Sequence, residues 1–336
     1  MRKLIVGILV FLVLIGLWIA YAASPSVKDP EFPAHAVITY PWASPSPPQN
    51  VPPSLKVVTY NIGYGSGKKN NKPVALSRVQ VEDNLASMVE ALKRINPDVL
   101  ALQEVDFRSA RTYDINEFTY LAKALQMPYG AYVFTWNKNY VAWPYWPPQY
   151  QFGRMASGQG VLSRYPILGQ EVTVLDKPKQ NPFWYNWFYL DHIIQKILLQ
   201  VGKEPMTVWH VHLEAFDAPT RLKQIEKFSN LVLADKRKYR LAVGDFNSVS
   251  FHRDDFSQVE GETLEDAGQA IQEFMKLTGF HNAEWKQSVL TMPSWDPIKK
   301  IDHIFYADSF KFQYYGNMEN ILGSDHLPFW ASFSFY

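Results

Sequence analysis

The chain of 336 residues contains no cysteine. This absence excludes disulfide bonds, a metal centre built on thiolates, and a lipid-modified cysteine as a membrane anchor. The chain also lacks an excess of one charge, because 33 basic and 32 acidic residues give a formal net charge of +1. Nonspecific nucleic-acid binding needs a concentrated basic face, so this balance of charges argues against such binding. A balanced net charge still allows local basic patches.

An apolar run opens the chain. Two basic residues, Arg2 and Lys3, precede uninterrupted apolar sequence from Leu4 to Ala20. The run and the small-x-small string Ala20-Tyr21-Ala22 are typical of a secretory signal peptide. Residues 1–23 are also long enough to stay as a membrane-spanning anchor. In both cases we expect the remaining protein to be exported, either periplasmic or extracellular, or held at the membrane by this segment.

A proline-rich segment follows. Residues 24–54 hold nine of the 23 prolines, including the run Ser44-Pro45-Ser46-Pro47-Pro48. We expect such a segment not to pair as a sheet but to form an extended linker. It could lift the domain from a membrane or lie along the domain surface. The globular domain is then expected at 55–336, which is ample for one large α/β core.

Hydrophobic periodicity predicts the main elements of this domain. Apolar residues recur at helical spacing over 78–95, and Pro97 helps to end that helix. Further helices are expected at 118–125, 220–234 and 264–277. Strands are expected at 57–61, 98–104, 160–163, 193–201, 206–212, 240–245 and 301–306. Many strands interrupted by a few helices fit two sheets packed face to face with helices outside.

Two short strings near the C-terminus carry the most chemical information. Gly-Asp-Phe-Asn at 244–247 follows the apolar residues 241–243, and Ser-Asp-His-Leu-Pro occupies 324–328. A strand that ends in carboxylate, amide and imidazole groups holds them on a rigid support. Oxygen ligands without thiolates suit a hard cation such as Mg²⁺. The pattern predicts metal-assisted hydrolysis, with a phosphate ester as the expected substrate.

Polar residues interrupt other predicted strands in the same way: Asn61, Glu104, His212 and Asp302. Taken in order with 245, 247, 325 and 326, they resemble the motif series of the endonuclease/exonuclease/phosphatase superfamily, which includes deoxyribonuclease I. The resemblance covers roughly residues 55–336. It implies an α/β fold of four layers, in which two packed mixed sheets are flanked by helices.

The resemblance also implies roles for single residues. The metal would be Mg²⁺, or alternatively Mn²⁺, and its expected ligands are Asn61, Glu104 and Asp325. The expected catalytic residues are His212, Asp245, Asn247, Asp302 and His326. Asp245 is expected to pair with His326, and Asp302 with His212. An Asp-x-Asn string can also be an Asx-turn, and a single histidine on a strand can be a hydrogen-bonded core residue. The joint occurrence favours the catalytic interpretation, since buried charges need partners.

Several residues depart from the family pattern or have open roles. His210 replaces an asparagine two residues before His212; it could reach the site edge or be hydrogen-bonded inside the sheet. His303 is expected to point away from the site and to be structural. Candidates to bind phosphate are Arg108, Arg111, Arg154 and Arg164, with an ion pair to Asp106 as the alternative role of Arg111.

Two strongly aromatic segments bear on the substrate. They span 143–150 and 183–189, the second with six aromatic residues in seven. Tyrosine and tryptophan favour the membrane–water interface, so Trp184, Trp187 and Phe188 are expected to contact a membrane surface. The rings could instead pack onto the domain or stack nucleobases.

These observations predict a Mg²⁺-dependent hydrolase of phosphate esters outside the cytoplasm, acting on lipid head groups. The alternatives are a metal-dependent endonuclease, for which the neutral charge is unfavourable, and a non-catalytic binding protein that retains the fold. A monomer is expected.

Overall fold

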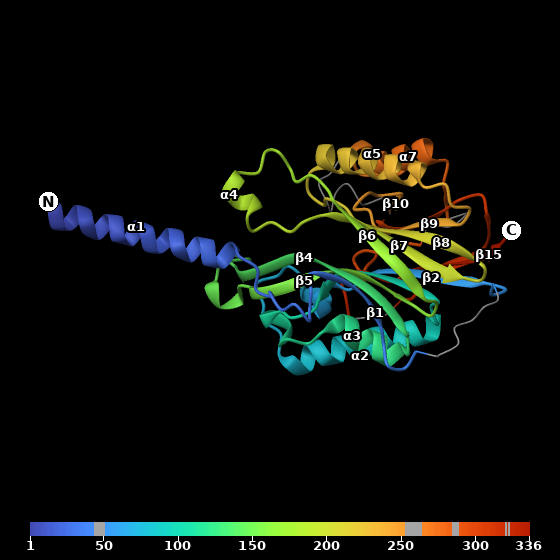
Figure 1. The fold of residues 1–336 in the computed structure, drawn as a ribbon, viewed down its shortest axis with the longest axis horizontal. Coiled ribbons are helices and arrows are strands. Elements are labelled where there is room, and N and C mark those ends of the chain that lie inside the picture. The colour runs from blue at the N-terminus through green and yellow to red at the C-terminus, as the bar shows by residue number, and fades with distance from the viewer. Residues whose placement is uncertain (44–50, 253–263, 284–288, 320, 322) are drawn as a thin grey trace.

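The computed structural model describes residues 1–43, 51–252, 264–283, 289–319, 321 and 323–336. Two mixed β-sheets lie face to face, and helices cover the outer face of each (Figure 1). The predicted α/β sandwich of four layers is therefore confirmed. The proline run at 44–48 lies outside the described residues.

The larger sheet has seven strands. Their order is β1 (His35–Thr39), β4 (Tyr129–Val141), β5 (Gly153–Ser163), β3 (Val99–Asp106), β2 (Leu55–Asn61), β15 (Phe329–Phe335) and β14 (Phe310–Asn317). Its outer face is covered by α2 (Arg78–Ile95) and α3 (Glu117–Leu125). The α2 helix has the predicted bounds. It begins with a capping box, in which Ser77 and Gln80 bond reciprocally to each other's backbone N–H.

The smaller sheet has six strands. Their order is β11 (His281–Asn282), β13 (Asp302–Tyr306), β9 (Arg240–Asp245), β8 (Glu204–His212), β7 (Ile193–Val201) and β6 (Ile167–Val174). Two helices cover it, α5 (Ala218–Ala234) and α7 (Leu264–Thr278). The remaining elements are a two-stranded sheet of β10 (Phe251–His252) and β12 (Lys299–Lys300), the short helix α4 (Phe183–Asn186), and the 3₁₀ helices η1 (Gly63–Gly65), η2 (Gly67–Lys69), η3 (Ala110–Thr112) and η4 (Pro148–Tyr150).

The core lies in three apolar layers. Between the sheets, small and branched side chains such as Val57, Val99, Val208 and Ile304 are fully buried. A second layer lies under α2 and α3, and a third under α5 and α7. Because both faces of the central strands β3 and β9 are buried, these strands are apolar over 99–102 and 241–243 and become polar where they reach the sheet edge.

Parallel pairing brings the polar strand ends together. In the larger sheet β2 runs parallel to β3, with Asn61 opposite Gln103. In the smaller sheet β8 runs parallel to β9, with His212 opposite Asp245. The carboxyl ends of parallel strands meet at one edge of a sheet, so both sheets present their functional groups at the same end of the sandwich, which we call the catalytic end.

The prediction that the proline-rich segment 24–54 cannot pair as a sheet is wrong for part of it. Residues 35–39 form β1, which pairs antiparallel with β4. The prolines at 33 and 41 flank this stretch, so its N–H groups are free to join the ladder. The described part of the segment therefore lies along the domain, as one of the two alternatives proposed.

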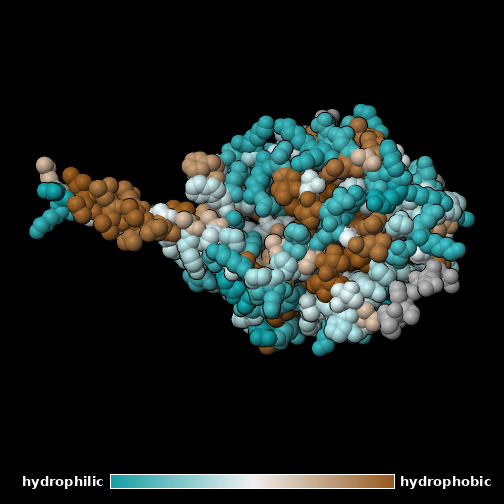
Figure 2. All heavy atoms as spheres, viewed as in Figure 1, coloured by the Kyte–Doolittle hydropathy of each residue, from teal (hydrophilic) through white to brown (hydrophobic). Residues whose placement is uncertain are grey.

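A single long helix precedes the domain. The α1 helix (Arg2–Ala23) is long and apolar enough to cross a membrane, a test that a signal sequence also passes. It projects from the body at the side where α4 lies (Figure 1), and it stands out as an apolar rod beside a largely hydrophilic surface (Figure 2).

Candidate active site

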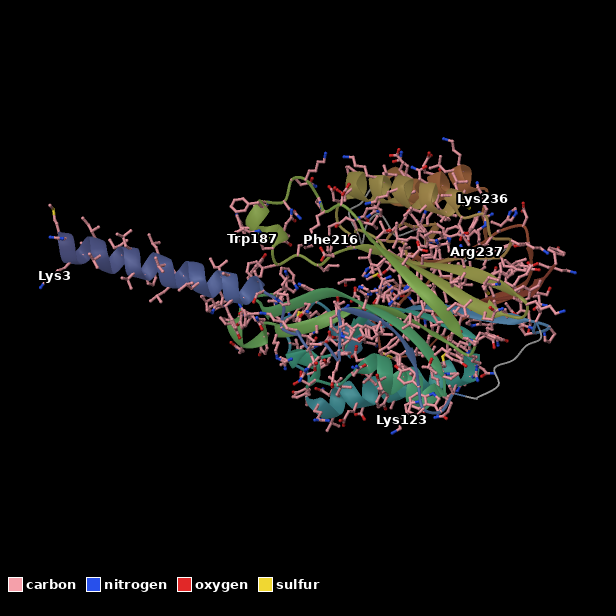
Figure 3. All side chains as sticks on the ribbon, viewed as in Figure 1. Lys3, Lys123, Trp187, Phe216, Lys236 and Arg237 are labelled. Carbon is pink, nitrogen blue, oxygen red and sulfur yellow. The ribbon has the colours of Figure 1, made fainter. Side chains whose placement is uncertain are left out.

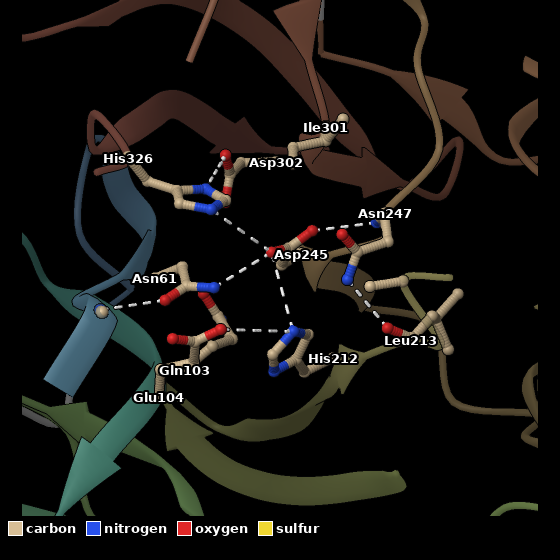
Figure 4. A network of polar contacts seen from close by, with 12 residues as sticks. Asn61, Gln103, Glu104, His212, Leu213, Asp245, Asn247, Ile301, Asp302 and His326 are labelled. Carbon is tan, nitrogen blue, oxygen red and sulfur yellow. Dashed lines mark hydrogen bonds and ion pairs between the residues drawn. The ribbon is translucent and has the colours of Figure 1, made fainter. Parts of the chain in front are cut away.

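Asp245 lies at the centre of the network of polar groups at the catalytic end (Figure 4). Its Oδ2 accepts a hydrogen bond of 3.0 Å from the Asn61 amide, and its Oδ1 accepts one of 2.9 Å from the backbone N–H of Asn247. The imidazole Nε2 atoms of His212 and His326 approach the same Oδ2 at 3.7 and 3.8 Å. One carboxylate thus faces two imidazoles.

Asp302 pairs with His326 rather than with His212. The Nδ1 atom of His326 lies 2.9 Å from Asp302 Oδ2, and both side chains are buried. The expected pairing of Asp302 with His212 is therefore wrong, whereas the expected contact of Asp245 with His326 is present at 3.8 Å. Asp302 stands opposite Asp245 on the adjacent strand, and the loop at 324–326 brings the His326 ring over Asp302.

The carboxylates around His326 determine its charge. Burial would lower its pKa, but Asp302, and then Asp245 and Asp325, outweigh burial and raise the pKa to about 10. His326 is therefore an imidazolium at neutral pH, with Nδ1–H bound to Asp302 and Nε2–H directed to Asp245. A charged ring of this kind can donate to a phosphate oxygen, and it has no free position to accept a proton from water.

Burial shifts the pKa values of Asp245 and His212 so that both favour the neutral form, in contrast to His326. Burial, reinforced by the charge of Asp302, raises the pKa of Asp245. Burial lowers the pKa of His212, and the nearby carboxylates of Asp245 and Glu104 offset this only in part. A buried carboxylate with a raised pKa is a better proton acceptor than an ordinary aspartate, and it is the group best suited here to activate water.

Two of the three expected metal ligands, Glu104 and Asp325, meet at one amide that the sequence analysis missed. Asn70 Nδ2 donates to Glu104 Oε2 at 3.0 Å and to both carboxylate oxygens of Asp325 at 3.2 Å. The Asn70 Oδ1 atom is buried and has no hydrogen-bond partner among the described residues. Asn70 lies in a loop rich in lysine and asparagine, and no spacing in the sequence distinguishes it.

In the third expected metal ligand, Asn61, both the nitrogen and the oxygen of the side-chain amide are hydrogen-bonded. Its Nδ2 donates to Asp245, and its Oδ1 accepts from the Gly63 N–H at 3.0 Å, which leaves one lone pair of the oxygen. Asn61 therefore orients the Asp245 carboxylate directly. The Ser324 hydroxyl donates to the Asn61 carbonyl at 2.7 Å, which fixes the 324–326 loop against β2.

The backbone is strained where it aims these groups. Glu104 adopts a left-handed φ of 52°, at a register shift between Leu102 and Val105 that lifts it out of the β3–β5 ladder. Gly63 also has a positive φ of +52°, and a Cβ there would lie 2.7 Å from Asp325 Oδ1. Glycine at 63 thus leaves room for the Asp325 carboxylate.

The side chain of Asn247 does not reach the centre of the network. Its Nδ2 donates to the Leu213 carbonyl at 2.8 Å, while its backbone N–H binds Asp245. The string Asp245–Asn247 therefore has the hydrogen bond of an Asx-turn within the site. The two interpretations of this string are compatible, because the turn itself positions the Asp245 carboxylate.

Both unusual histidines are internal. His210 is fully buried and hydrogen-bonded, with Nε2 at 2.6 Å from Gln103 and Nδ1 at 3.0 Å from Gln195. Burial lowers its pKa to about 3. His303 lies on the other side of its strand, with Nε2 at 2.9 Å from the Ser248 carbonyl, so its structural role is confirmed.

Most of the candidate arginines have structural partners. Arg111 forms a double hydrogen bond with Asp106, its alternative role, and its guanidinium lies 3.5 Å from the centre of the Tyr64 ring. Arg154 pairs with Asp114 at 2.6 and 2.8 Å, and Arg164 donates to the carbonyl of residue 97. Arg108 is exposed and remains a candidate to bind phosphate.

The described residues contain an acidic group that could hold a divalent cation. One atom from each of Asp245, Asp302 and His326 lies within 4.8 Å of the other two. In that trio, however, the His326 ring already bonds Asp302. The carboxylates of Glu104 and Asp325, which both accept from the Asn70 amide, form a second set, and their oxygens are the ligands that a hard cation prefers.

Known structures share this fold. An endonuclease/exonuclease/phosphatase from Beutenbergia cavernae superposes with a TM-score of 0.58 at 17% identity, covering 84% of this chain and 72% of that chain. A mannosyl-6-phosphatase from Bacteroides thetaiotaomicron gives a TM-score of 0.56 at 14% identity, covering 84% and 100%. The 2′,3′-cyclic phosphatase ANGEL2 gives 0.51 at 17% identity, covering 84% and 96%. At these identities the likeness establishes the fold.

Sequence comparison supplies the family. No relative among curated proteins matches the chain. The sequence model described as the Endonuclease/Exonuclease/phosphatase family matches residues 58–326, which include Asn61 at the end of β2 and His326 beside Asp302. The chain therefore belongs to the endonuclease/exonuclease/phosphatase family, whose members are hydrolases that act on phosphoester bonds.

Proposed function

We propose that this protein is a Mg²⁺-dependent phosphoesterase that works outside the cytoplasm on phosphate esters of lipid head groups. The observation that carries the chemistry is the buried network in which Asp245 faces His212 and His326, with His326 charged by Asp302. Such a network combines a proton acceptor with donors for phosphate oxygens.

In the proposed mechanism, Asp245 accepts a proton from the attacking water. Asn61 and the Asn247 N–H hold its two oxygens in place, so the carboxylate needs no reorganisation as the proton arrives. The imidazolium of His326 donates Nε2–H to a phosphoryl oxygen, and Asp302 keeps the ring charged and oriented. His212, on the facing edge of the site, donates to another oxygen once the phosphate raises its pKa.

Glu104, Asp325 and Asn70 fit a divalent cation. Two carboxylates already converge on one amide, and the buried Asn70 Oδ1 can turn toward a cation that replaces the amide N–H contacts. A bound Mg²⁺ would polarise a phosphoryl oxygen and neutralise charge on the leaving oxygen. Mn²⁺ prefers the same hard oxygen ligands and is the expected substitute.

Three features support the location and the substrate class. The apolar α1 helix supports export or anchoring, with Arg2 and Lys3 on the cytoplasmic side. The near-neutral charge is unfavourable for DNA, and the two aromatic segments favour a lipid surface.

The first test measures turnover of bis-p-nitrophenyl phosphate by the full chain, with Mg²⁺ and then with EDTA. We expect EDTA to abolish turnover, and Glu104→Ala and His326→Ala each to lower kcat by about 10²- to 10⁴-fold. His281→Ala is a matched control, because His281 also pairs with an aspartate but is exposed at the far edge of the sheet. Wild-type turnover in both site variants would refute the proposal.

Substrate class and the non-catalytic alternative are separated by two further assays. Supercoiled plasmid, sphingomyelin vesicles and soluble inositol phosphates are offered side by side; faster nicking of plasmid than lipid turnover would favour the endonuclease alternative. A calorimetric titration that detects no binding of Mg²⁺ or Mn²⁺ to folded protein would favour a binding protein that retains the fold.

A further inference from the structure

We propose that α1, two loops rich in exposed aromatic rings and a third loop that carries Phe216 form one membrane-contact surface around the catalytic end, so that the site faces the bilayer that α1 enters. The inference deepens the proposed function and rests on it for the reaction. The surface itself consists of residues that take no part in the catalytic network.

The α1 helix is fastened to the domain rather than tethered by a loose linker. Its Trp18 ring packs 5.7 Å from the Tyr140 ring near the end of β4. Lys138 Nζ donates to the Ala23 carbonyl at 3.0 Å, and Asn139 Nδ2 donates to the Ser24 hydroxyl at 2.9 Å. These contacts fix the direction in which α1 leaves, so a bilayer around α1 would meet the same side of the domain each time.

That side is the catalytic end. The last paired residue of β3, Asp106, lies opposite Ser157 of β5, and Ser157 lies opposite Trp136 of β4. The β4–β5 pair continues beyond this point to Val141 and Gly153. Five further residues of strand add about 17 Å, so the hairpin projects past the sheet edge from which Glu104 reaches the site.

The tip of this hairpin carries the first set of exposed rings. Trp143, Tyr145 and Trp146 have 38%, 60% and 77% of their surface exposed. Exposed apolar rings that gather on one loop, rather than being scattered singly, indicate an interaction surface.

The loop between β6 and β7 carries the second set. It leaves and returns at the catalytic end, since β6 ends at Val174 and β7 starts opposite the end of β8. Phe183, Trp184 and Trp187 are 72%, 53% and 48% exposed, whereas Phe188 is half-buried. Of the three residues expected to contact a membrane, Trp184 and Trp187 are thus available.

The two aromatic loops touch each other. The Trp136 indole of β4 donates to the carbonyl of Phe188 at 2.7 Å. The phenol of Tyr145 lies close enough to that of Tyr185 to raise the pKa of Tyr185 further, after burial, so the hairpin tip lies beside α4. Figure 1 shows α4 and the turn of the β4–β5 hairpin at the end of the body from which α1 leaves, so both sets of rings belong to loops beside the base of α1.

A third loop adds Phe216, four residues after His212. Its ring is 87% exposed, and it lies on the same side of the molecule as Trp187 (Figure 3). From the second aromatic loop a chain of contacts leads into the site. Tyr189 donates to Glu214 at 3.0 Å, and His192 lies 3.2 Å from Glu214 and donates to the His212 carbonyl at 2.9 Å.

A bilayer is the partner that fits this surface. The 22 residues of α1 span about 33 Å, which matches a hydrocarbon core of about 30 Å. Tryptophan and tyrosine rings at the end of such a helix lie at the depth of the head groups. The consequence for catalysis is that the site reaches phosphate esters of lipids in the bilayer that holds α1, without releasing them into water.

Because the chain has no cysteine, single labels can test this arrangement. Trp146→Cys, Trp184→Cys and Phe216→Cys are each made in the full chain, labelled with a polarity-sensitive nitrobenzoxadiazole dye, and reconstituted into phosphatidylcholine–phosphatidylglycerol vesicles. Matched controls are Lys123→Cys and Lys236→Cys, at exposed positions away from α1 (Figure 3). Emission is recorded with and without nitroxide-labelled lipid.

We expect a blue shift of emission and strong quenching by nitroxide lipid at 146, 184 and 216, and neither at 123 or 236. Emission and quenching at the three sites equal to the controls would overturn the membrane-contact surface. Because this readout needs no turnover, it separates the two proposals. Labels that lie in the membrane on an inactive enzyme would refute the proposed function but support the membrane-contact surface. Labels that stay in water on an active enzyme would support the proposed function but refute the membrane-contact surface.

A second measurement connects the surface to the substrate. Trp146→Ser and Trp184→Ser should lower turnover of vesicle-borne phosphate ester several-fold while turnover of soluble bis-p-nitrophenyl phosphate stays at the wild-type rate. Equal turnover of the vesicle substrate in both variants and wild type would overturn the link between the surface and catalysis.

Discussion

Replacing Asp302 by asparagine should destabilise the protein strongly at acidic and neutral pH and only weakly at alkaline pH. Asp302 and His326 form a buried ion pair at 2.9 Å, with side chains 0% and 5% exposed. The amide of Asp302→Asn has nearly the same shape but no charge, so the imidazolium of His326 would be left buried without its main partner. Breaking a buried pair in this way costs about 3 to 5 kcal/mol.

The pH dependence follows from the raised pKa of His326. Its pKa is about 10 in the folded state and 6.5 in the unfolded reference, so the charged ring binds its proton more tightly when folded. The stabilisation is fully present below pH 6.5, where it amounts to roughly 5 kcal/mol, and it is lost as pH rises through 10. At pH 9.5 about 1 kcal/mol remains.

The assay is urea unfolding of wild type and Asp302→Asn at pH 6 and pH 9.5 in EDTA, so that only the charges of the chain act. The free-energy difference between the two proteins should shrink by several kcal/mol from the lower to the higher pH. Asp308→Asn is the matched control, because the Asp308–His281 pair is solvent-exposed and should contribute little at either pH. A difference for Asp302→Asn that is constant with pH would refute the ion-pair argument.

Three further outcomes are expected. Asn70→Asp should enlarge the rise in Tm caused by Mg²⁺, and Asn70→Ala should reduce it, because Asn70 lies between the carboxylates of Glu104 and Asp325. Differential scanning calorimetry with and without Mg²⁺ measures both rises. Rises equal to that of the wild type would exclude Asn70 as a ligand. Gly63→Ala should lower the free energy of unfolding by about 1 to 3 kcal/mol in chemical denaturation, because of the left-handed φ and the approach to Asp325; unchanged stability would contradict this steric argument. Asp245→Asn should lower kcat by about 10²- to 10⁴-fold with little change in KM, and a change confined to KM would refute its role as the base.

Local sequence carries enough information for the helices and for the polar strand ends. The apolar stripe of 78–95 has a period that suits only a helix packed on one side, and the structure has α2 at those bounds. Asn61, Glu104, His212 and Asp245 follow largely apolar runs, and a strand buried on both faces most readily becomes polar where it leaves the core. Their order along the chain was sufficient to identify the family.

The sequence could not show which of these distant residues would pair with each other in the site. The sequence contains several carboxylates and imidazoles at strand ends, and nothing local says which of them meet. Antiparallel β9–β13 register sets Asp302 opposite Asp245, and the 324–326 loop then decides that His326 meets Asp302. Asn70 was missed for the same reason, since its contacts with Glu104 and Asp325 are 34 and 255 residues away in sequence.

By itself, the sequence determined which groups the protein has: an apolar N-terminal helix, two aromatic segments, and a set of oxygen and imidazole residues at strand ends. Only the tertiary structure decided that they share one end of the molecule. The β4–β5 ladder runs five residues past the last pair of β3, and the β6–β7 loop returns at the edge where His212 lies. Strand register and length are set by partners across the sheet, so the arrangement of helix, rings and site arises only once both sheets have formed.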